Sequence, residues 1–236
     1  MRRRINRAAA RVVDAALEAV PGLRPFVASR VDDRRLELAL TRLQREGTTI
    51  GTVYDIGAHC GDWTRSIRPA LPDATFVLFE GNPTHEGALR HLAAHVVIDV
   101  LADEERDVAW VATGEPGDSY RRELTPEYSE AASTRVRATT LDAVVARDAL
   151  PPPDLIKADV QGAELDVLAG GRRALEHASA VLLECPILPY NEGAPTIDAY
   201  FAFMDDAGFT VDDVVHAHRR EGRTFHADVL FVRVGS

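Results

Sequence analysis

The stretch TVYDIGAHCGDW, residues 52–63, decides the fold, because an apolar run ends there in a carboxylate and leads directly into a glycine loop. A second stretch, ATFVLFEGNP at residues 74–83, repeats the apolar run and ends it at Glu80. The separation of Asp55 and Glu80 is close to the roughly 20 residues expected for one strand–helix–strand unit. A glycine turn lets a ligand approach the backbone, and a carboxylate at the next strand end accepts hydrogen bonds from two ribose hydroxyls. The two stretches together predict a nucleoside-binding site.

The loop itself indicates which nucleoside would bind. Gly57 and Gly61 bracket Ala58, His59 and Cys60, which is neither the dinucleotide pattern G-x-G-x-x-G nor a P-loop. No cationic residue of the loop is placed to bind a phosphate, and an aspartate flanks it on either side, so pyrophosphate is repelled and cations are attracted. These charges favour S-adenosylmethionine, an adenine nucleoside that carries a sulfonium and an ammonium and no phosphate. A ligand-free strand–helix turn is the alternative, and it explains the glycines but not Glu80.

Carboxylates recur at the ends of the later apolar runs. The run HVVIDVLADEE at residues 95–105 reaches Asp103, whose side chain is expected either to face the adenine edge or to belong to a solvated turn. The stretch LIKADVQGAELDVLAGG predicts a strand that ends at Asp159, and AVLLECP predicts one that ends at Glu184. Ligands of open parallel sheets bind outside the carboxyl ends of the strands. A periodic series of mutually repelling acids at that edge therefore favours a cationic ligand there.

The segments DIGAHCGDW, FEGNP and TTLD … IKADVQGAELDVLAGG together resemble the FkbM-type methyltransferases. The resemblance runs from about residue 50 to the C-terminus, and its most specific element is K-x-D-x-x-G-x-E, formed here by Lys157, Asp159, Gly162 and Glu164. It implies an S-adenosylmethionine-dependent O-methyltransferase of natural products or sugars. It also implies the α/β class I methyltransferase fold, a Rossmann-like three-layer sandwich around a mostly parallel seven-stranded sheet with one antiparallel strand.

The resemblance and the loop pattern also specify the expected cofactor-binding residues. These are Asp55, Gly57, Ala58, His59, Gly61, Glu80, Gly81, Asn82, Asp103 and Asp159. Asn82 has a structural alternative, because an asparagine followed by a proline is typical of a helix N-cap.

Methyl transfer to oxygen requires alignment of the two reactants and a base that removes the hydroxyl proton. Glu184 is the first choice as base or acceptor-orienting group, and Asp159 is expected to neutralise the methionine ammonium or orient the cofactor. His59 is a third catalytic candidate, because an imidazole can accept a proton at neutral pH, with packing on the cofactor as its alternative. Glu164 stands at a predicted helix start, where the helix dipole alone favours an acid. A magnesium ion shared by Asp159 and Glu184 is possible but not favoured, since only two oxygen ligands are visible, and no metal ligand is assigned.

Composition and charge restrict the domain organisation, the partners and the cellular location that the sequence allows. The 236 residues predict a helical segment at 1–48, serving as a lid or dimer contact, and a methyltransferase domain at 49–236. A net charge of −10 argues against nucleic acid as a partner, which leaves a small-molecule or glycan acceptor, with a homodimer as an open alternative. No run is long enough to span a membrane and no signal peptide is recognisable.

Cys60 and Cys185 are expected about 9–10 Å apart across the sheet, too far for a disulfide, and their spacing is not that of metal ligands. The prediction is a cytoplasmic protein with reduced thiols.

Several segments outside the motifs also carry predictions. Residues 5–20 and 31–45 are amphipathic and predict two helices, and the apolar runs at 209–216 and 227–234 predict a closing β-hairpin. The long polar stretch at 114–133 is expected to border the acceptor site. Two other functions remain open: a catalytically silent nucleoside-binding scaffold with this fold, and a dehydrogenase, which the glycine spacing disfavours.

Overall fold

The computed structural model describes residues 24–93, 95–111, 118–122, 124, 132–188, 191–220 and 223–235. The helix expected at residues 5–20 and most of the 114–133 stretch lie outside the described residues. None of the described helices is long and apolar enough to cross a membrane. Both cysteines are free thiols, as predicted.

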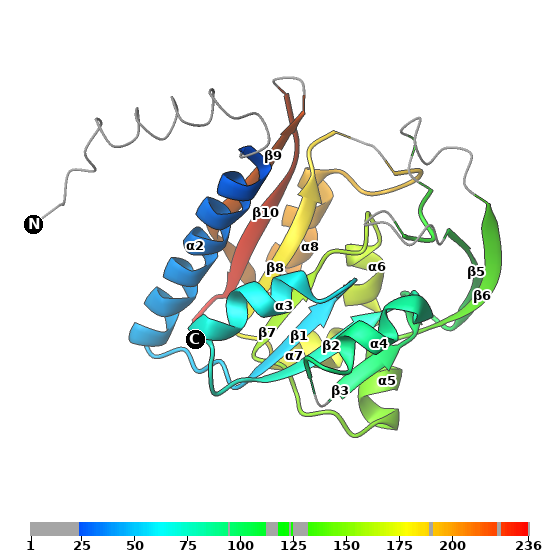
Figure 1. The fold of residues 1–236 in the computed structure, drawn as a ribbon, viewed down its shortest axis with the longest axis horizontal. Helices are drawn as coiled ribbons and strands as arrows, with labels where there is room; N and C mark the ends of the chain where they lie inside the picture. The colour runs from blue at the N-terminus through cyan, green and yellow to red at the C-terminus, as the bar shows by residue number, and fades with distance from the viewer. Residues whose placement is uncertain are drawn as a thin grey trace, which may run out of the picture.

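A seven-stranded sheet forms the centre of the molecule (Figure 1). Its strands, in spatial order, are β3 (His95–Ile98), β2 (Thr75–Glu80), β1 (Thr52–Ile56), β7 (Leu155–Ala158), β8 (Ala180–Pro186), β10 (Arg223–Arg233) and β9 (Phe209–Arg220). Strand β10 is antiparallel to both of its neighbours, and the other pairs among β3, β2, β1, β7 and β8 are parallel. The predicted fold class and the closing hairpin of β9 and β10 are therefore confirmed.

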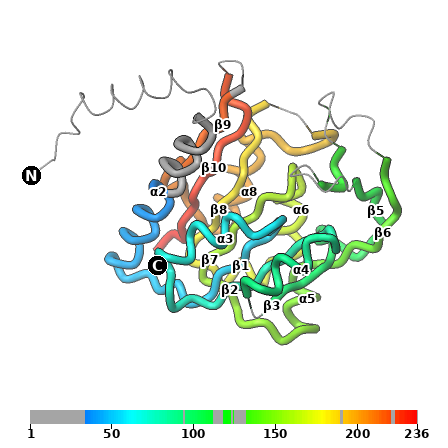
Figure 2. Tube along the Cα trace, in the orientation of Figure 1, coloured from blue at the N-terminus to red at the C-terminus, as the bar shows by residue number. Residues whose placement is uncertain are grey.

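Helices cover both faces of this sheet and create two apolar cores. One face carries α2 (Arg24–Arg45), α3 (Asp62–Ile67), η2 (Arg68–Ala70), η3 (Pro83–His85) and α4 (Glu86–Leu89), and the other carries α5 (Leu141–Arg147), α6 (Glu164–Ala169), α7 (Arg172–His177) and α8 (Ile197–Asp206). Successive strand residues point to opposite faces, so Val53 joins the first core and Tyr54 the second. The helix expected at 31–45 is the C-terminal part of α2. It runs beside β9 at one edge of the sheet and buries Leu36 and Leu40 against it (Figure 2).

A small second sheet takes up part of the segment 95–105 that the sequence predicts to be a single run. Strands β4 (Val100–Leu101), β6 (Ser133–Thr139) and β5 (Arg106–Val111) pair in that order and stand to one side of the main sheet (Figure 1). The sequence predicts residues 95–105 as one run that reaches a strand-end acid at Asp103, and this prediction is wrong, whereas the alternative of a solvated turn at Asp103 is found. Strand β3 ends at Ile98, because the next residues leave the main sheet to pair with β6. The acid at the strand end is Asp99, whereas Asp103 lies in an exposed turn and pairs with Arg106.

Candidate functional site

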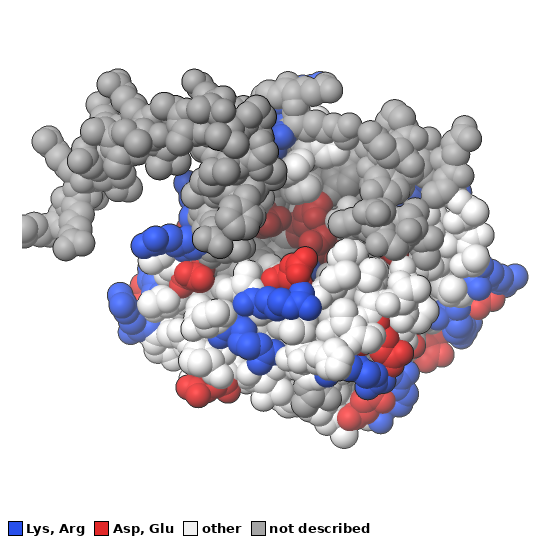
Figure 3. Space-filling model, viewed as in Figure 1, with Lys and Arg blue, Asp and Glu red and all other residues white. Residues whose placement is uncertain are grey.

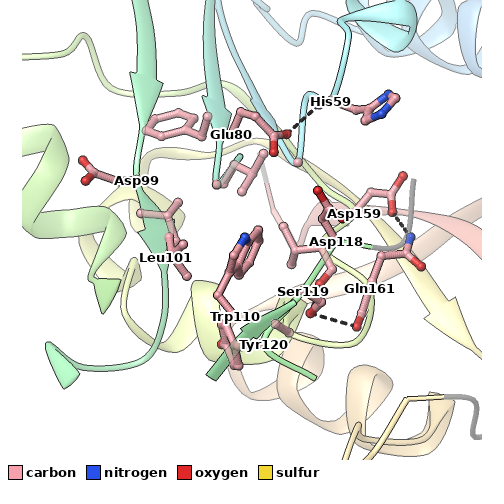
Figure 4. A pocket seen from close by; sticks show the side chains of 17 residues that line it. His59, Glu80, Asp99, Leu101, Trp110, Asp118, Ser119, Tyr120, Asp159 and Gln161 are labelled. Carbon is pink, nitrogen blue, oxygen red and sulfur yellow. Dashed lines mark hydrogen bonds between the residues drawn. The ribbon is translucent and has the colours of Figure 1, made fainter. Parts of the chain in front are cut away.

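A cavity opens at the carboxyl ends of β1, β2, β3 and β7, where the sequence analysis expects the ligand. Figure 4 shows Glu80 on one side of it, Asp159 with Gln161 on another, and Trp110 on a third. The seven-stranded sheet supplies the acidic walls, and the small sheet supplies Leu101 and Trp110. The cavity is thus built between the two sheets, which the strand-end acids alone could not reveal.

Glu80 is the carboxylate that holds the glycine loop in place. It is nearly buried, its Oε2 accepts a hydrogen bond from the backbone N–H of His59 at 2.7 Å, and its Oε1 accepts one from the backbone N–H of Asn82 at 2.8 Å. A carboxylate oxygen accepts more than one hydrogen bond, so both oxygens keep acceptor capacity toward the cavity that Glu80 lines. The predicted position of Glu80 at the cavity is found, and the residue also joins the loops that follow β1 and β2.

Two glycines make room at the floor of the cavity. A Cβ at Gly57, whose φ is 77°, would lie 1.9 Å from the carbonyl oxygen of Asp159, and a Cβ at Gly81 would lie 2.6 Å from the ring of Trp110. Both positions therefore need glycine for close approach, and both line the cavity. Gly61 does not line it. Its φ is 83°, and an added Cβ would meet Leu92 at 2.2 Å, so glycine is needed there for the packing of the loop.

Asp55 lies beneath the loop instead of in the cavity. It is completely buried, its Oδ2 accepts a hydrogen bond from the Thr64 hydroxyl at 2.7 Å, and its Oδ1 lies 3.1 Å from Nζ of Lys157. Lys157 is the only lysine in the sequence, and its Nζ also donates to the carbonyl oxygen of Gly57 at 3.0 Å. Burial works to lower the pKa of Lys157, but Asp55 and Asp159 outweigh it and hold the pKa above its ordinary value. The expected contact of Asp55 with a cofactor is thus replaced by a buried ion pair that fixes the glycine loop.

Ala58 and Asn82 also lie next to the cavity without lining it. Ala58 is buried and its backbone N–H donates to the carbonyl oxygen of Phe79 at 3.0 Å. Asn82 is buried, and its Oδ1 accepts a hydrogen bond from the backbone N–H of Thr84 at 3.0 Å, which confirms the N-cap interpretation. Its Nδ2 donates to Oδ2 of Asp118 at 2.6 Å, so Asn82 also anchors part of the long polar stretch at the cavity.

Several residues that line the cavity were not identified from the sequence. Trp110 projects from β5, and its indole Nε1 is buried with no hydrogen-bond partner among the described residues. Asp118, Ser119 and Tyr120 line the same side, and the Ser119 hydroxyl donates to the carbonyl oxygen of Val160 at 3.0 Å (Figure 4). These residues bring part of the 114–133 stretch to this cavity. Trp110 could have been suspected only from the alternating pattern of residues 106–111.

Asp159 and Glu184 lie side by side and share an amide donor. Nε2 of Gln161 donates to Oδ1 of Asp159 at 2.9 Å and to Oε2 of Glu184 at 3.3 Å. Burial works to raise the pKa of Asp159, but Lys157 and the hydrogen bonds with Glu184 and Gln161 outweigh it and hold the pKa below its ordinary value. The amide stands between the two carboxylates, where a shared magnesium ion would have to bind.

A histidine pairs with Glu184 on the side away from the cavity. Nδ1 of His226 lies 2.9 Å from Oε1 of Glu184, and the His226 ring stacks on His218 with ring centroids 4.8 Å apart. Burial lowers the pKa of His226 and outweighs the opposite effect of Asp228 and other nearby carboxylates. His226 comes from β10, opposite Pro186 of β8. No local sequence signal could have placed it, because the contact depends on the antiparallel return of β10.

Glu164 has a structural position. It is buried, and its Oε1 accepts hydrogen bonds from the backbone N–H groups of Val160 and Gly162 at 2.8 and 3.1 Å. Its Oε2 accepts a hydrogen bond from the Tyr200 hydroxyl. Burial raises the pKa of Glu164. Glu164 therefore closes the turn between β7 and α6.

The comparison with protein families decides what this site belongs to. The model of the methyltransferase FkbM domain matches residues 55–211, which is more than half of the chain. The chain belongs to the FkbM methyltransferase family. The match covers the glycine loop, Glu80, the K-x-D-x-x-G-x-E segment and Glu184. The comparison with curated proteins gives no match.

One solved structure supports the fold of this FkbM family member, and a second shows a weaker likeness. The crystal structure of methyltransferase FkbM from Methylobacillus flagellatus is 12% identical in sequence with a TM-score of 0.50, and the match covers 78% of this chain. The chain spans 44% of the length of that protein. A putative O-methyltransferase from Klebsiella pneumoniae is 13% identical with a TM-score of 0.48, covering 84% of this chain and 79% of that one. At such identities the likeness to the Methylobacillus protein concerns the fold alone.

Proposed function

We propose that this FkbM family member transfers a methyl group from S-adenosylmethionine to a hydroxyl oxygen of a small molecule or sugar. The observation that carries the proposal is the charge of the cavity. Four carboxylates line it, from Glu80, Asp99, Asp118 and Asp159, and no lysine or arginine is among its described lining residues. Figure 3 likewise shows acidic side chains gathered near the centre of the face in view. Such a lining disfavours phosphates and favours a nucleoside with a positive end.

The described residues fit S-adenosylmethionine from end to end. Glu80 would accept hydrogen bonds from the ribose hydroxyls, and Asp159 would face the methionine ammonium. Asp99, which follows β3 and also pairs with Arg147, would accept a hydrogen bond from the adenine amino group, with Leu101 and Trp110 as apolar neighbours of the ring. The glycines at positions 57 and 81 provide the space for a ligand at the backbone. When bound, S-adenosylmethionine supplies an electrophilic methyl group.

Glu184 and His226 would supply the base for the acceptor. A hydroxyl becomes a good nucleophile when a positioned group takes its proton. Nδ1 of His226 lies 2.9 Å from Oε1 of Glu184, so in the proposed base the carboxylate would stabilise the imidazolium formed when the ring takes the hydroxyl proton, as in other carboxylate–histidine pairs. The pair stands one strand beyond Asp159, and Gln161 links the two. The acceptor would therefore bind over β7 and β8, beside the methionine end of the cofactor.

Cofactor binding provides the first test. Isothermal titration of the purified protein with S-adenosylhomocysteine is expected to give one site per chain. Glu80→Ala should weaken that affinity roughly tenfold or more, because each lost hydrogen bond to a charged group is worth about 1.5–3 kcal/mol and 1.4 kcal/mol is tenfold. Glu104→Ala, which removes an exposed acid outside the cavity, is the matched control and should leave the affinity unchanged. No binding by the wild type, or equal affinity in Glu80→Ala, would refute the assignment.

Turnover distinguishes an enzyme from a silent binding protein. Transfer of a radiolabelled methyl group to a panel of hydroxylated natural products and sugars is expected to identify an acceptor. If S-adenosylhomocysteine binds but no panel member is methylated, the scaffold function is favoured over the enzyme.

The pH dependence of turnover follows from the state of His226. Its neutral form is the base, and burial places its pKa below the ordinary value of about 6.5. Activity should therefore fall only when the pH drops below about 6.5, as His226 becomes protonated. A profile of kcat against pH on the acceptor found above measures this. A half-maximal point clearly above that value would show that another group is the base.

A further inference from the structure

A cluster of sulfur and nitrogen donors is formed by the glycine loop and η3, at the edge of the cavity that His59 lines. His59 and Cys60 belong to the loop after β1, and His85 ends η3, just after β2. Sγ of Cys60 lies 3.4 Å from Nδ1 of His85, and the rings of His59 and His85 have centroids 4.3 Å apart. One donor atom from each residue lies within 4.8 Å of the other two, and no other group of three such donors occurs among the described residues.

These distances match a tetrahedral metal site. With zinc–sulfur bonds of about 2.3 Å and zinc–nitrogen bonds of about 2.0–2.1 Å, the sulfur and a nitrogen ligand stand about 3.6 Å apart. Cys60 Sγ and His85 Nδ1 lie 3.4 Å apart, about 0.2 Å less than the separation expected for two ligands of one zinc ion. A metal ion could therefore bind both atoms with little movement of either side chain.

The burial of His85 gives a second, independent indication. The residue is 9% exposed, and its Nε2 is buried with no hydrogen-bond partner among the described residues. An unsatisfied buried polar atom costs about 1–3 kcal/mol, so packing alone accounts poorly for a histidine here. A metal ion bound at Nδ1, the nitrogen that faces Cys60, would hold the ring in this position although Nε2 stays unsatisfied.

The backbone that carries the donors is fixed on both sides. The N–H of His59 donates to Glu80, and His59 adopts the left-handed conformation with φ 47°. On the other side, Asn82 caps Thr84 one residue before His85. A non-glycine residue in this conformation is uncommon and persists when the surroundings hold it. The two loops thus hold the donors together before any ion arrives.

We propose that His59, Cys60 and His85 form a binding site for a divalent transition-metal ion of the zinc type. One thiolate and two imidazoles suit zinc, whereas magnesium and calcium prefer oxygen ligands. Three protein ligands leave the fourth tetrahedral position for water or another small ligand. Coordination would occupy the His59 imidazole and remove it from the candidates for the base, and Figure 4 shows that ring turned away from Trp110. The assignment of this site does not rest on the proposed methyl transfer, although His59 also lines the cavity.

Cobalt is the probe that tests this assignment. Full-length protein freed of metal with a chelator is titrated with Co²⁺, then with Zn²⁺. The expected result is one Co²⁺ per chain, a thiolate-to-cobalt charge-transfer band in the near ultraviolet, and loss of that band as Zn²⁺ displaces Co²⁺. Absence of stoichiometric binding, or binding without the charge-transfer band, would overturn the proposal.

Variants identify the ligands. Cys60→Ser should abolish the band, and Cys60→Ser and His85→Gln should each weaken Zn²⁺ binding by more than the roughly 10–100-fold that loss of an outer-shell partner costs. Cys185→Ala, which removes the only other cysteine, and His91→Gln, an exposed histidine nearby, are the matched controls and should bind as the wild type does. Circular dichroism checks folding, and Cys60→Ser alone decides the matter if His85→Gln does not fold. A band that survives in Cys60→Ser and vanishes in Cys185→Ala would refute the site.

Discussion

Replacing Lys157 by methionine should lower the free energy of unfolding by about 3–5 kcal/mol, because removal of one partner leaves a buried charge unpaired. Lys157 and Asp55 are both buried, and their Nζ and Oδ1 atoms lie 3.1 Å apart. The variant would also lose the hydrogen bond from Nζ to the carbonyl oxygen of Gly57. Urea unfolding followed by circular dichroism measures the change. We also expect weaker cofactor binding, since this ion pair supports the glycine loop.

A double variant separates the charge effect from simple loss of packing. Lys157→Met combined with Asp55→Asn should recover part of the lost stability, because no unpaired carboxylate is then buried while Thr64 keeps an oxygen to donate to. Arg90→Met, which breaks the exposed ion pair with Glu86, is the control and should cost no more than about 0.5 kcal/mol. If Lys157→Met costs as little as Arg90→Met, the ion pair does not support the loop as described.

The second large effect concerns turnover. Glu184→Gln should lower kcat by about 10²- to 10⁴-fold, the usual contribution of a positioned base, and leave the affinity for S-adenosylhomocysteine unchanged. Glu184 does not line the cofactor cavity but holds Nδ1 of His226 at 2.9 Å. Single-turnover measurements on the identified acceptor, with calorimetry alongside, check both parts of the expectation.

Non-additivity provides the sharper test of the pair. His226→Gln should cost about as much as Glu184→Gln, and the double variant should cost little more than either, because residues that act as a unit are not additive. Glu176→Gln, an exposed acid on α7, is the control and should retain full activity. Independent, additive losses would show that Glu184 and His226 do not form one catalytic unit.

The positions of Glu80 and Asp159 could be predicted because they depend on local pattern. Each ends an apolar run, and the carboxyl ends of parallel strands meet at one edge of the sheet. The position of Asp55 could not be predicted in this way. Asp55 lies within β1, where successive side chains point to opposite faces of the sheet, so its side chain points to one face and not to the strand end. Asp55 points to the face of Val53 and pairs in register with Lys157 of β7. The sequence shows both charges but not that they are neighbours.

Asp103 failed as a prediction for a different reason. Residues 95–105 are one apolar run in the sequence, yet the run is divided between two sheets, and Asp99, at the point of division, lines the cavity and pairs with Arg147 at 2.9 Å. Which residues pair with β2 and which with β6 is settled by hydrogen bonds between distant strands. A local pattern carries no information about that choice.

The sequence alone determined the α/β sheet, the glycine loop and the acidic edge, because strand alternation, glycine turns and strand-end acids are encoded within short segments. Tertiary structure decided the partners of those residues: Lys157 for Asp55, His226 for Glu184, and His85 for Cys60. Each of these contacts joins two different strands or the loops that follow them. Their distances depend on strand order and register, which arise only when both faces of the sheet are packed.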